Sequence, residues 1–138
     1  MRAENFASPG AFARDSAKTY ALPKALTLNQ WALAGSWKVA DEHARLQGAP
    51  GRIAFRFKAR DLHLVLGPGT GKPVKFRVTV DGKAPGASAG MDVDAQGNGV
   101  VREHRLYNLV RQKGAVAESE FVIEFLEPGV DAYSFTFG

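Results

Sequence analysis

The sequence of 138 residues contains no cysteine. This absence excludes thiol catalysis, disulfide bonds and thiolate metal sites within the chain, and it leaves the redox compartment undetermined. Long apolar runs are missing as well, since no stretch approaches the roughly 20 residues of a membrane-spanning helix, and the first residues lack the charged and then apolar pattern of a signal peptide. We therefore expect no direct insertion of this chain into a membrane.

Charge of either sign is not concentrated in the chain. The 18 Lys and Arg residues against 14 Asp and Glu give a formal net charge of +4, which permits an anionic partner without requiring one. The hydrophobic share is 45% and no long polar tract interrupts it, as expected of a globular domain rather than a disordered segment. The length matches a single domain that buries its own core.

The sequence offers little for acid–base or nucleophilic catalysis. It has no Gly-x-Ser-x-Gly motif, and His43, His63 and His104 each stand within an expected strand beside charged or apolar neighbours. The glycine-rich loop at residues 67–73 does not match a phosphate-binding loop. Leu66 stands where that motif has its first glycine, and Pro73 stands where Ser or Thr should follow the lysine. We therefore expect this chain not to be an enzyme and to carry no cofactor.

The clearest structural pattern lies in residues 51–83, which predict three successive β-strands. Every second residue is apolar from Ile53 to Phe57 and again from Val74 to Val80. A pleated strand sends successive side chains to opposite faces, so this alternation is typical of half-buried strands. The Asp81-Gly82 pair that follows predicts a type I′ turn, because both central residues of that turn need positive φ.

Other segments complete a prediction of about eight strands in an antiparallel jelly-roll β-sandwich. Further strands are expected at 26–28, 31–37, 100–110, 121–126 and 133–137, and a bulge or break is expected between the apolar phase of Trp37 and Val39 and that of Ala44 and Leu46. Residues 1–20 read as an irregular arm with a short helical turn, and residues 21–138 as one domain. The predicted core comprises Ile53, Phe55, Phe57, Leu64, Val78, Phe121, Ile123, Phe125 and Phe135.

Residues 92–103 match the spacing of a calcium-binding loop. The alternating oxygen ligands, the glycine and the later glutamate correspond to Asp92, Asp94, Gln96, Gly97 and Glu103. No amphipathic helix precedes the loop, and the alternative is a turn whose Asp and Gly residues set the backbone geometry. Calcium at these residues is thus a hypothesis, with the turn as the favoured interpretation.

Five basic residues are expected on one side of two neighbouring strands: Arg52, Arg56, Lys58, Lys75 and Arg77. Nucleic-acid binding by β-modules usually adds exposed aromatic rings on which bases stack. Here Phe55, Phe57 and Phe76 alternate to the opposite, apolar face. We therefore expect a solvated or ion-paired face and no nucleic-acid partner.

Aromatic rings and hydrogen-bonding side chains outside the core are the remaining candidates for ligand binding. Aromatic faces stack on pyranose rings, and arginine and carboxylate groups pair with sugar hydroxyls. We expect Trp37 and Tyr133 to anchor the core and leave Trp31 and Tyr107 open between core and binding platform. The candidate ligand-binding residues are Trp31, Arg60, Asp61, His63, Asp92, Asp94, Arg105 and Tyr107.

Six segments, in order along the chain, resemble a known module: RAENFAS (2–8), YALPKALTLNQWALAGSW (20–37), GRIAFRFKARDLHLVLGP (51–68), DVDAQGNGVV (92–101), RLYNLVRQ (105–112) and FVIEFLEPGVDAYSFTFG (121–138). In these segments the chain resembles the C-terminal β-sandwich domain of DipZ-type cytochrome c biogenesis proteins and related thioredoxin-like (TlpA-like) proteins. In that family the module follows a thioredoxin-like domain, which is itself often preceded by a membrane-embedded electron-transfer domain.

The resemblance implies a setting for the chain. Residues 1–20 would be an arm that follows the thioredoxin-like domain, residues 21–138 the sandwich, and the parent protein would be periplasmic or otherwise extracytoplasmic. Thiol–disulfide exchange would belong to the parent, because this chain has no Cys-x-x-Cys motif. No catalytic residue carries over to these 138 residues.

Two functions remain open on these grounds. The family's sandwich is described as similar to carbohydrate-binding modules, which implies an accessory domain that presents a binding or docking surface to a glycan or a protein substrate. The alternative is a purely structural module that stabilises the adjacent thioredoxin domain and binds no ligand.

Overall fold

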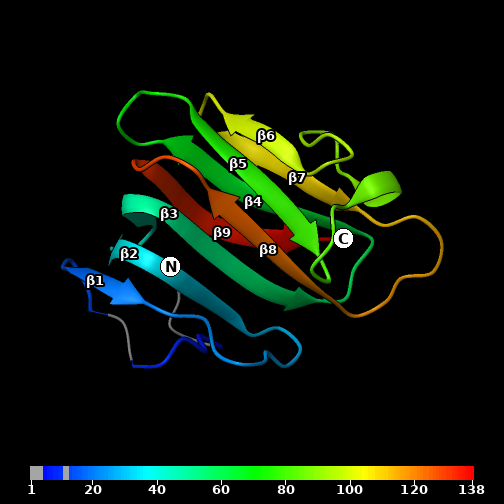
Figure 1. The fold of residues 1–138 in the computed structure, drawn as a ribbon, viewed down its shortest axis with the longest axis horizontal. Helices are drawn as coiled ribbons and strands as arrows, with labels where there is room; N and C mark the ends of the chain where they lie inside the picture. Colours follow the sequence, from blue (N-terminus) through cyan, green and yellow to red (C-terminus); the bar gives the residue numbers. More distant parts are fainter. Residues whose placement is uncertain (1–4, 11–12) are drawn as a thin grey trace.

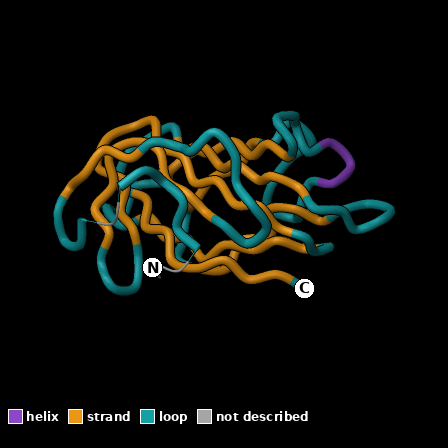
Figure 2. The backbone as a smooth tube through the Cα atoms, turned by 90° about the horizontal axis from the view of Figure 1, so that it is seen from below, coloured by secondary structure: helices purple, strands orange, loops and turns teal. Residues whose placement is uncertain are grey.

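Nine β-strands provide the regular structure of the computed structural model, which describes residues 5–10 and 13–138 (Figure 1). They are β1 (Ala17–Tyr20), β2 (Trp31–Val39), β3 (Ala44–Phe57), β4 (Asp61–Pro68), β5 (Val74–Val80), β6 (Asn98–Val101), β7 (Arg105–Arg111), β8 (Ser119–Phe125) and β9 (Val130–Phe137). A short 3-10 helix, η1 (Gly86–Ser88), lies at one end of the molecule (Figure 2). The predicted all-β antiparallel fold is confirmed, with nine strands where about eight were expected.

Strand β3 connects the two layers into which the sheet curls. Its first residues pair with β9, Ala44 opposite Ala132, whereas Gly51–Phe57 pair with β8. One layer continues from β3 through β8, β5 and β6, and the other through β9, β4 and β7. Strand β2 pairs with the other edge of β3, and β1 with β2. In Figure 1, β8 and β5 pass in front of β9 and β4, as expected of a sandwich.

The core between the layers is built from the alternation that the sequence displays. All nine predicted core residues except Phe135 are buried, and each large apolar side chain contributes roughly 1.5–3 kcal/mol by leaving water. Phe135 is only half-buried and packs on the core from its edge. The predicted turn is also confirmed, because Asp81 and Gly82 have φ of 53° and 78° and the flanking Val80 and Lys83 exchange backbone hydrogen bonds of 2.8 and 3.1 Å.

The predicted strand at 26–28 is wrong. Leu26 instead packs with Ala32 and Ala54 in a small apolar cluster on the outer face of β2 and β3. Asn29 adopts a positive φ of 69° and donates its backbone N–H to the carbonyl of Arg56 at 2.7 Å. The segment therefore crosses the sheet as a loop, and its apolar residues are held by the face beneath them.

The prediction of an irregular arm over residues 1–20 holds only in part. Ala17–Tyr20 form β1 against β2, and Phe6 makes a parallel bridge to Trp31. No helical turn occurs in residues 5–10 and 13–20, and residues 1–4 and 11–12 of the predicted arm lie outside the described residues. This strand forms within the predicted arm because the Tyr20 side chain is buried and anchors the end of β1.

The single strand predicted over 100–110 is two strands in different layers. β6 ends at Val101 beside β5, and β7 begins at Arg105 beside β4. The buried Tyr107 hydroxyl accepts hydrogen bonds from the backbone N–H groups of Arg102 and Glu103 at 3.2 and 3.3 Å and donates to the Glu103 carbonyl at 2.8 Å. This phenol fixes the corner that separates the two strands.

The break predicted between Val39 and Ala44 is confirmed, and a bulge that was not predicted lies earlier in β2. A tight turn at Ala40–His43 ends β2, and the β2–β3 register shifts around Gly35, between Ala34 and Ser36. Gly35 has a φ of 98°, and a Cβ there would lie 2.8 Å from the Pro50 carbonyl oxygen. Only glycine fits this position, where the β2–β3 ribbon bends.

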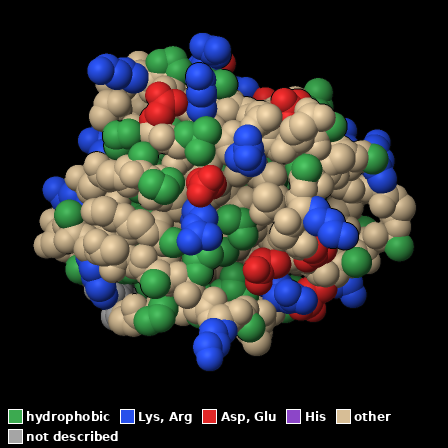
Figure 3. All heavy atoms as spheres, viewed as in Figure 1, with side chains coloured by type: hydrophobic (Ala, Val, Ile, Leu, Met, Phe, Trp, Pro, Cys, Tyr) green, Lys and Arg blue, Asp and Glu red, His purple; other side chains and the backbone are tan. Residues whose placement is uncertain are grey.

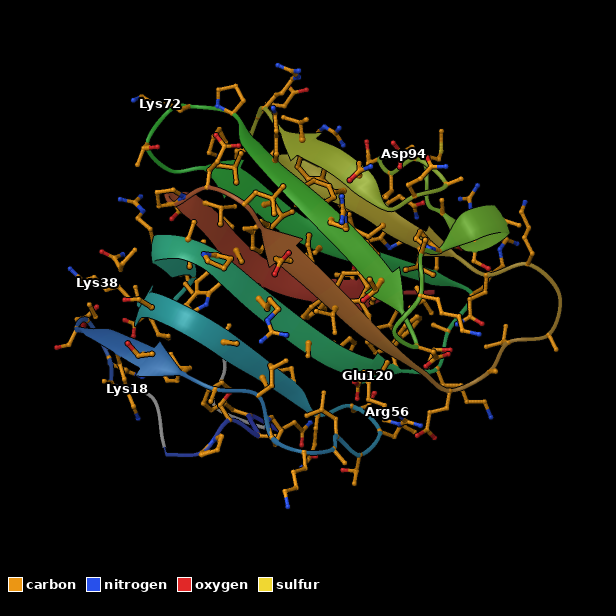
Figure 4. All side chains as sticks on the ribbon, viewed as in Figure 1. Lys18, Lys38, Arg56, Lys72, Asp94 and Glu120 are labelled. Carbon is orange, nitrogen blue, oxygen red and sulfur yellow. The ribbon has the colours of Figure 1, made fainter. Side chains whose placement is uncertain are left out.

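The two basic strands are not neighbours, because β8 lies between β3 and β5 and contributes carboxylates. Glu124 stands directly opposite both Arg52 and Arg77 in the register. Arg56 is hydrogen-bonded to Glu118 and stands opposite Glu120 (Figure 4). Acidic and basic side chains are accordingly interspersed over this face (Figure 3).

Candidate functional site

An aromatic groove opens where β9 separates from β3. It has a volume of about 700 Å³. We call it the aromatic groove, and its lining residues are Asn5, Asn29, Trp31, Asp41, Glu42, Phe55, Tyr133, Ser134, Phe135 and Phe137. Asn5 belongs to the N-terminal arm, and the other residues come from the two ends of the β2–β3 ribbon and from the last residues of β9.

Three aromatic residues of β9 line this groove: Tyr133, Phe135 and Phe137. The Phe135 ring stacks on Phe55 with centroids 4.5 Å apart and planes 17° apart, and Phe137 lies 6.1 Å from the same ring. Phe137 remains 52% exposed. The floor of the groove is thus a row of rings that the core holds at one end and that reaches solvent at the other.

Trp31 closes the groove at the start of β2. It is 8% exposed, and its ring lies 4.7 Å from that of Phe6. Its backbone N–H donates to the Asn5 carbonyl at 2.9 Å, and its carbonyl accepts from Ala7 at 2.8 Å. Trp31 therefore lines the groove while most of its side chain is buried in the core.

The rim of the groove is polar and carries acidic but not basic side chains. Asp41 and Glu42 are exposed on the turn between β2 and β3, and Asn5, Asn29 and Ser134 supply amide and hydroxyl groups. No Lys or Arg is among the described lining residues, although the chain has a net charge of +4. The groove consequently favours cationic or neutral polar groups over anions.

A cluster of rings and ion pairs adjoins the groove at Tyr133. His104 stacks on the Tyr133 ring at 4.7 Å, and His43 lies 5.3 Å from it. The buried Asp131 accepts two hydrogen bonds from Arg45 at 2.7 and 2.8 Å. Burial raises the pKa of Tyr133, and the negative charge of Asp131 adds to the effect. This cluster fixes the orientation of Tyr133, which was predicted to be core and instead is half-buried in the wall of the groove.

Three of the other predicted ligand-binding residues, Asp61, Asp92 and Arg105, lie in a separate region that also contains Asn108 and Arg111. We call these five residues the β4–β7 polar network. Asp61 accepts hydrogen bonds from Arg111 at 2.8 Å and from the Asn108 side chain at 3.5 Å. The bond from Arg111 is the main reason that the pKa of Asp61 is lowered, against the opposing effect of burial. Asn108 and Arg111 were not singled out in the sequence, and their spacing in β7 gives no separate signal.

Asp92 and Arg105 form the other half of the network. Asp92 accepts from Arg105 and from the Asn108 backbone N–H, both at 2.8 Å. Burial acts to raise the pKa of Asp92, but the hydrogen bonds from Arg105 and Asn108 outweigh it and lower the pKa. The Arg105 guanidinium also lies 3.9 Å from the centroid of the Tyr107 ring.

The predicted ligand-binding residues therefore do not form one site. Arg60 lies beside Asp61 with 3.4 Å between their charged atoms, and His63 is half-buried opposite Asn108 in the ladder. Tyr107 is 1% exposed, so its ring contributes to the core. Trp31 alone among the predicted residues lines the aromatic groove, and a ligand role for the rest stays a prediction.

The carboxylates of the calcium-like loop are engaged by protein donors. Asp94 accepts from the backbone N–H groups of Gln96 and Asn98 at 3.0 and 2.9 Å, and Glu103 lies 3.5 Å from Arg105. Asp94 lies on an exposed loop (Figure 4). In the part of the chain that the structure describes, no three His, Cys, Asp or Glu residues are grouped to hold a metal ion. Calcium binding at this loop stays a prediction.

Comparison with known proteins identifies the family of this chain. No curated protein matches the sequence. No helix within residues 5–10 and 13–138 has the length and apolar character that would let it span a membrane. The family model described as thioredoxin-like C-terminal domain matches residues 1–138 and implies a linked thioredoxin-like domain in the same polypeptide. The chain therefore belongs to the thioredoxin-like C-terminal domain family, as an accessory domain of a thioredoxin-like protein.

Proposed function

We propose that this chain is a non-catalytic docking domain that holds a ligand in the aromatic groove for the thioredoxin-like domain linked to it. The observation that carries the proposal is the row of rings formed by Phe55, Phe135 and Phe137, which ends in solvent beside an acidic rim. Concave surfaces that combine apolar walls with a few polar groups are where proteins bind ligands. A large exposed aromatic ring in such a place supports a binding role.

The chemistry of the parent protein belongs elsewhere in the polypeptide. Disulfide exchange proceeds by attack of a thiolate on a sulfur atom, and this chain has no cysteine. The domain would act by raising the local concentration of a substrate near the linked redox site, without taking part in bond making.

The setting that we propose follows the resemblance of the chain. The parent would be an extracytoplasmic protein of the DipZ type, and its role would be thiol–disulfide exchange or cytochrome c biogenesis. A docking domain suits that role, because such a redox domain must meet substrates that are themselves polypeptides.

Carbohydrate is one ligand class that the groove would suit. Aromatic rings stack on the C–H faces of pyranoses, and the amides of Asn5 and Asn29 with the carboxylate of Glu42 could pair with sugar hydroxyls. The alternative, a purely structural module, requires that neither a glycan nor a polypeptide bind the groove.

Isothermal titration calorimetry on the wild type and two variants tests the proposal. The probes are soluble oligosaccharides chosen with a glycan array and a reduced, alkylated, unfolded polypeptide. Phe137→Ser should weaken binding by about tenfold, because a central aromatic anchor is worth more than about 1 kcal/mol. Leu126→Ser is the matched control, since Leu126 is 45% exposed and lies outside the groove. Absence of binding to the wild type, or equal loss in both variants, would contradict the proposal.

A further inference from the structure

The last residues of β9 have a neighbouring strand on one side only. Strand β9 pairs with β4 through Phe137, but with β3 only at Asp131 and Ala132. Strand β3 begins at Ala44, and the turn before it holds Asp41 and Glu42, which line the groove together with the last residues of β9. From Tyr133 onward, no strand within residues 5–10 and 13–138 pairs with this edge of β9.

The backbone groups that face this edge can be identified from the ladder with β4. Asp61 and Gly138 exchange two backbone hydrogen bonds, of 3.1 and 3.3 Å. Hydrogen-bonded and non-hydrogen-bonded pairs alternate in an antiparallel ladder, so the pairs of Phe137 with Leu62 and of Phe135 with Leu64 are non-hydrogen-bonded ones. The N–H and C=O groups of Phe135 and Phe137 therefore point away from β4, toward the open edge.

Those groups find no other partner in the described residues. No backbone hydrogen bond joins Phe135 or Phe137 to any loop or turn of residues 5–10 and 13–138. Their side chains line the aromatic groove. The same two residues, Phe135 and Phe137, therefore supply aromatic rings in the groove and, at the open edge, backbone groups that are unpaired among the described residues.

The other edges of the sheet are short or covered. Strands β1 and β6 have four residues each. The outer edge of β7 is covered by a loop, since Gly90 and Asp92 donate backbone hydrogen bonds to Leu109 and Asn108 at 3.2 and 3.1 Å. Proteins usually protect an edge strand with charge, proline or a covering segment. The YSFTF sequence of residues 133–137 carries no charge and no proline.

A strand added to this edge would be recognised by charge as well as by shape. In an antiparallel addition the C-terminal end of the incoming segment lies beside Tyr133 and the acidic turn. Asp41 is ion-paired with Arg14 at 3.3 Å, whereas Glu42 is exposed, has no ion-pair partner among the described residues and lies close enough to Tyr133 to act on its phenol. A basic residue at that end of the segment would therefore meet Glu42.

The geometry points to an extended polypeptide as the ligand: it adds as an antiparallel strand to β9 at Phe135 and Phe137, places every second side chain in the aromatic groove and a basic residue beside Glu42. Strand addition of this kind draws affinity from main-chain hydrogen bonds and specificity from alternate side chains. The inference rests on the proposed docking function and names the ligand class of the same groove. It suits a redox partner whose substrates are unfolded or extended chains.

The test uses fluorescence anisotropy with a labelled ten-residue peptide of alternating Val and Thr that has Lys next to its C-terminus. Residues that exchange hydrogen bonds with Phe135 and Phe137 have side chains on the groove face, so the Val amides face β9 and the Thr amides face solvent. N-methylation of the Val amides should weaken binding at least about tenfold, from two lost hydrogen bonds of roughly 1 kcal/mol each. N-methylation of the Thr amides is the matched control and should change affinity less than about twofold.

Variants of the chain test the same backbone hydrogen bonds by changing Phe137 instead of the peptide. Phe137→Pro removes the N–H at the open edge, where proline is tolerated, and Phe137→Val removes only the ring. The Pro variant should bind about fivefold more weakly than the Val variant, as for one lost hydrogen bond. Glu42→Gln should lower the affinity for the Lys peptide a few-fold. It should not change the affinity for a peptide with Gln in place of Lys. The peptide series alone decides the matter if the Pro variant does not fold.

Each further outcome has a defined meaning. Binding of an oligosaccharide that Phe137→Val weakens, without binding of the peptide, would overturn this inference and leave the docking function standing. Binding of neither would overturn both. Self-association in sedimentation that Phe137→Pro abolishes and Phe137→Val preserves would assign the edge to a second copy of the chain and overturn the inference.

Discussion

The β4–β7 polar network and the aromatic groove differ in how fully their polar groups are paired. In the network, Asp92 accepts two hydrogen bonds at 2.8 Å and Asp61 accepts from Arg111 at the same distance. At the groove, the backbone groups of Phe135 and Phe137 face an edge without a paired strand among the described residues. Of these two regions, the groove is the one with backbone groups that have no partner among the described residues.

The difference shows how side chains that look reactive in a sequence can be structural. Charged residues that pair with one another fix the loop and the strand, and removing Asp92 leaves the backbone N–H of the buried Asn108 without its acceptor. Unpaired groups beside an apolar surface cost stability and persist where binding uses them. Substitution in the network should therefore affect stability, and substitution in the groove should affect binding.

The largest effect on stability is expected from Asp92→Ala. Two donors, the Arg105 guanidinium and the Asn108 backbone N–H, lose their acceptor, which should lower the free energy of unfolding by about 2 kcal/mol. Phe137→Ala is the groove counterpart and should cost less than about 1 kcal/mol, because half of the side chain is already in water. Urea denaturation measures both, and a smaller loss for Asp92→Ala than for Phe137→Ala would reverse the comparison.

A smaller effect is expected from Tyr107→Phe. The phenol accepts from two backbone N–H groups and donates to the Glu103 carbonyl, so its loss should cost about 1 kcal/mol. Tyr133→Phe is the matched control, since no hydrogen bond of the Tyr133 hydroxyl occurs among the described residues. Equal melting temperatures for the two variants would show that the Tyr107 hydroxyl does not fix the corner.

The pH dependence of stability should further distinguish the β4–β7 polar network from the aromatic groove. The pKa of Asp61 is lowered in the folded chain, chiefly by the hydrogen bond from Arg111. A depressed folded pKa contributes stability above the unfolded value of about 3.9, and that contribution disappears as pH falls through the folded pKa. Acid titration of the unfolding midpoint should therefore show a steeper loss below about pH 4 in the wild type than in Asp61→Asn. Parallel curves would contradict the role of this carboxylate.

The smallest effect is expected from calcium. The Asp92 and Asp94 carboxylates already accept hydrogen bonds from protein donors. We expect the melting temperature to be the same in excess chelator and in millimolar calcium. A rise with calcium that Asp94→Asn abolishes would establish the loop as a metal site.

More of the fold than of the candidate site could be predicted from the sequence. Alternation at Ile53–Phe57 and Val74–Val80 identified core faces, because burial acts on every second residue of a strand. The strand at 26–28 was mispredicted because Leu26 packs outside the main core, on the outer face of β2 and β3. The break between Val101 and Arg105 was missed because it depends on a hydrogen-bonded phenol, which leaves no periodic signal.

The groove could not be predicted because it depends on where two strands separate. The apolar pattern of YSFTF predicted the strand at 133–137, but it does not show that β3 leaves β9 after Ala132. The β4–β7 polar network likewise unites residues that lie up to 50 positions apart. Such meetings follow from strand order, which no local pattern encodes.

Hydrogen exchange of the Phe135 and Phe137 amides tests the central claim most directly. The amides are followed by NMR in the 138-residue chain, with and without the Val and Thr peptide that ends in Lys. Strand addition to β9 predicts that both exchange more slowly in the complex, while the amides of Asn108 and Glu103 are unchanged. Unaltered exchange at Phe135 and Phe137 with saturating peptide, or protection confined to the β4–β7 polar network, would contradict it.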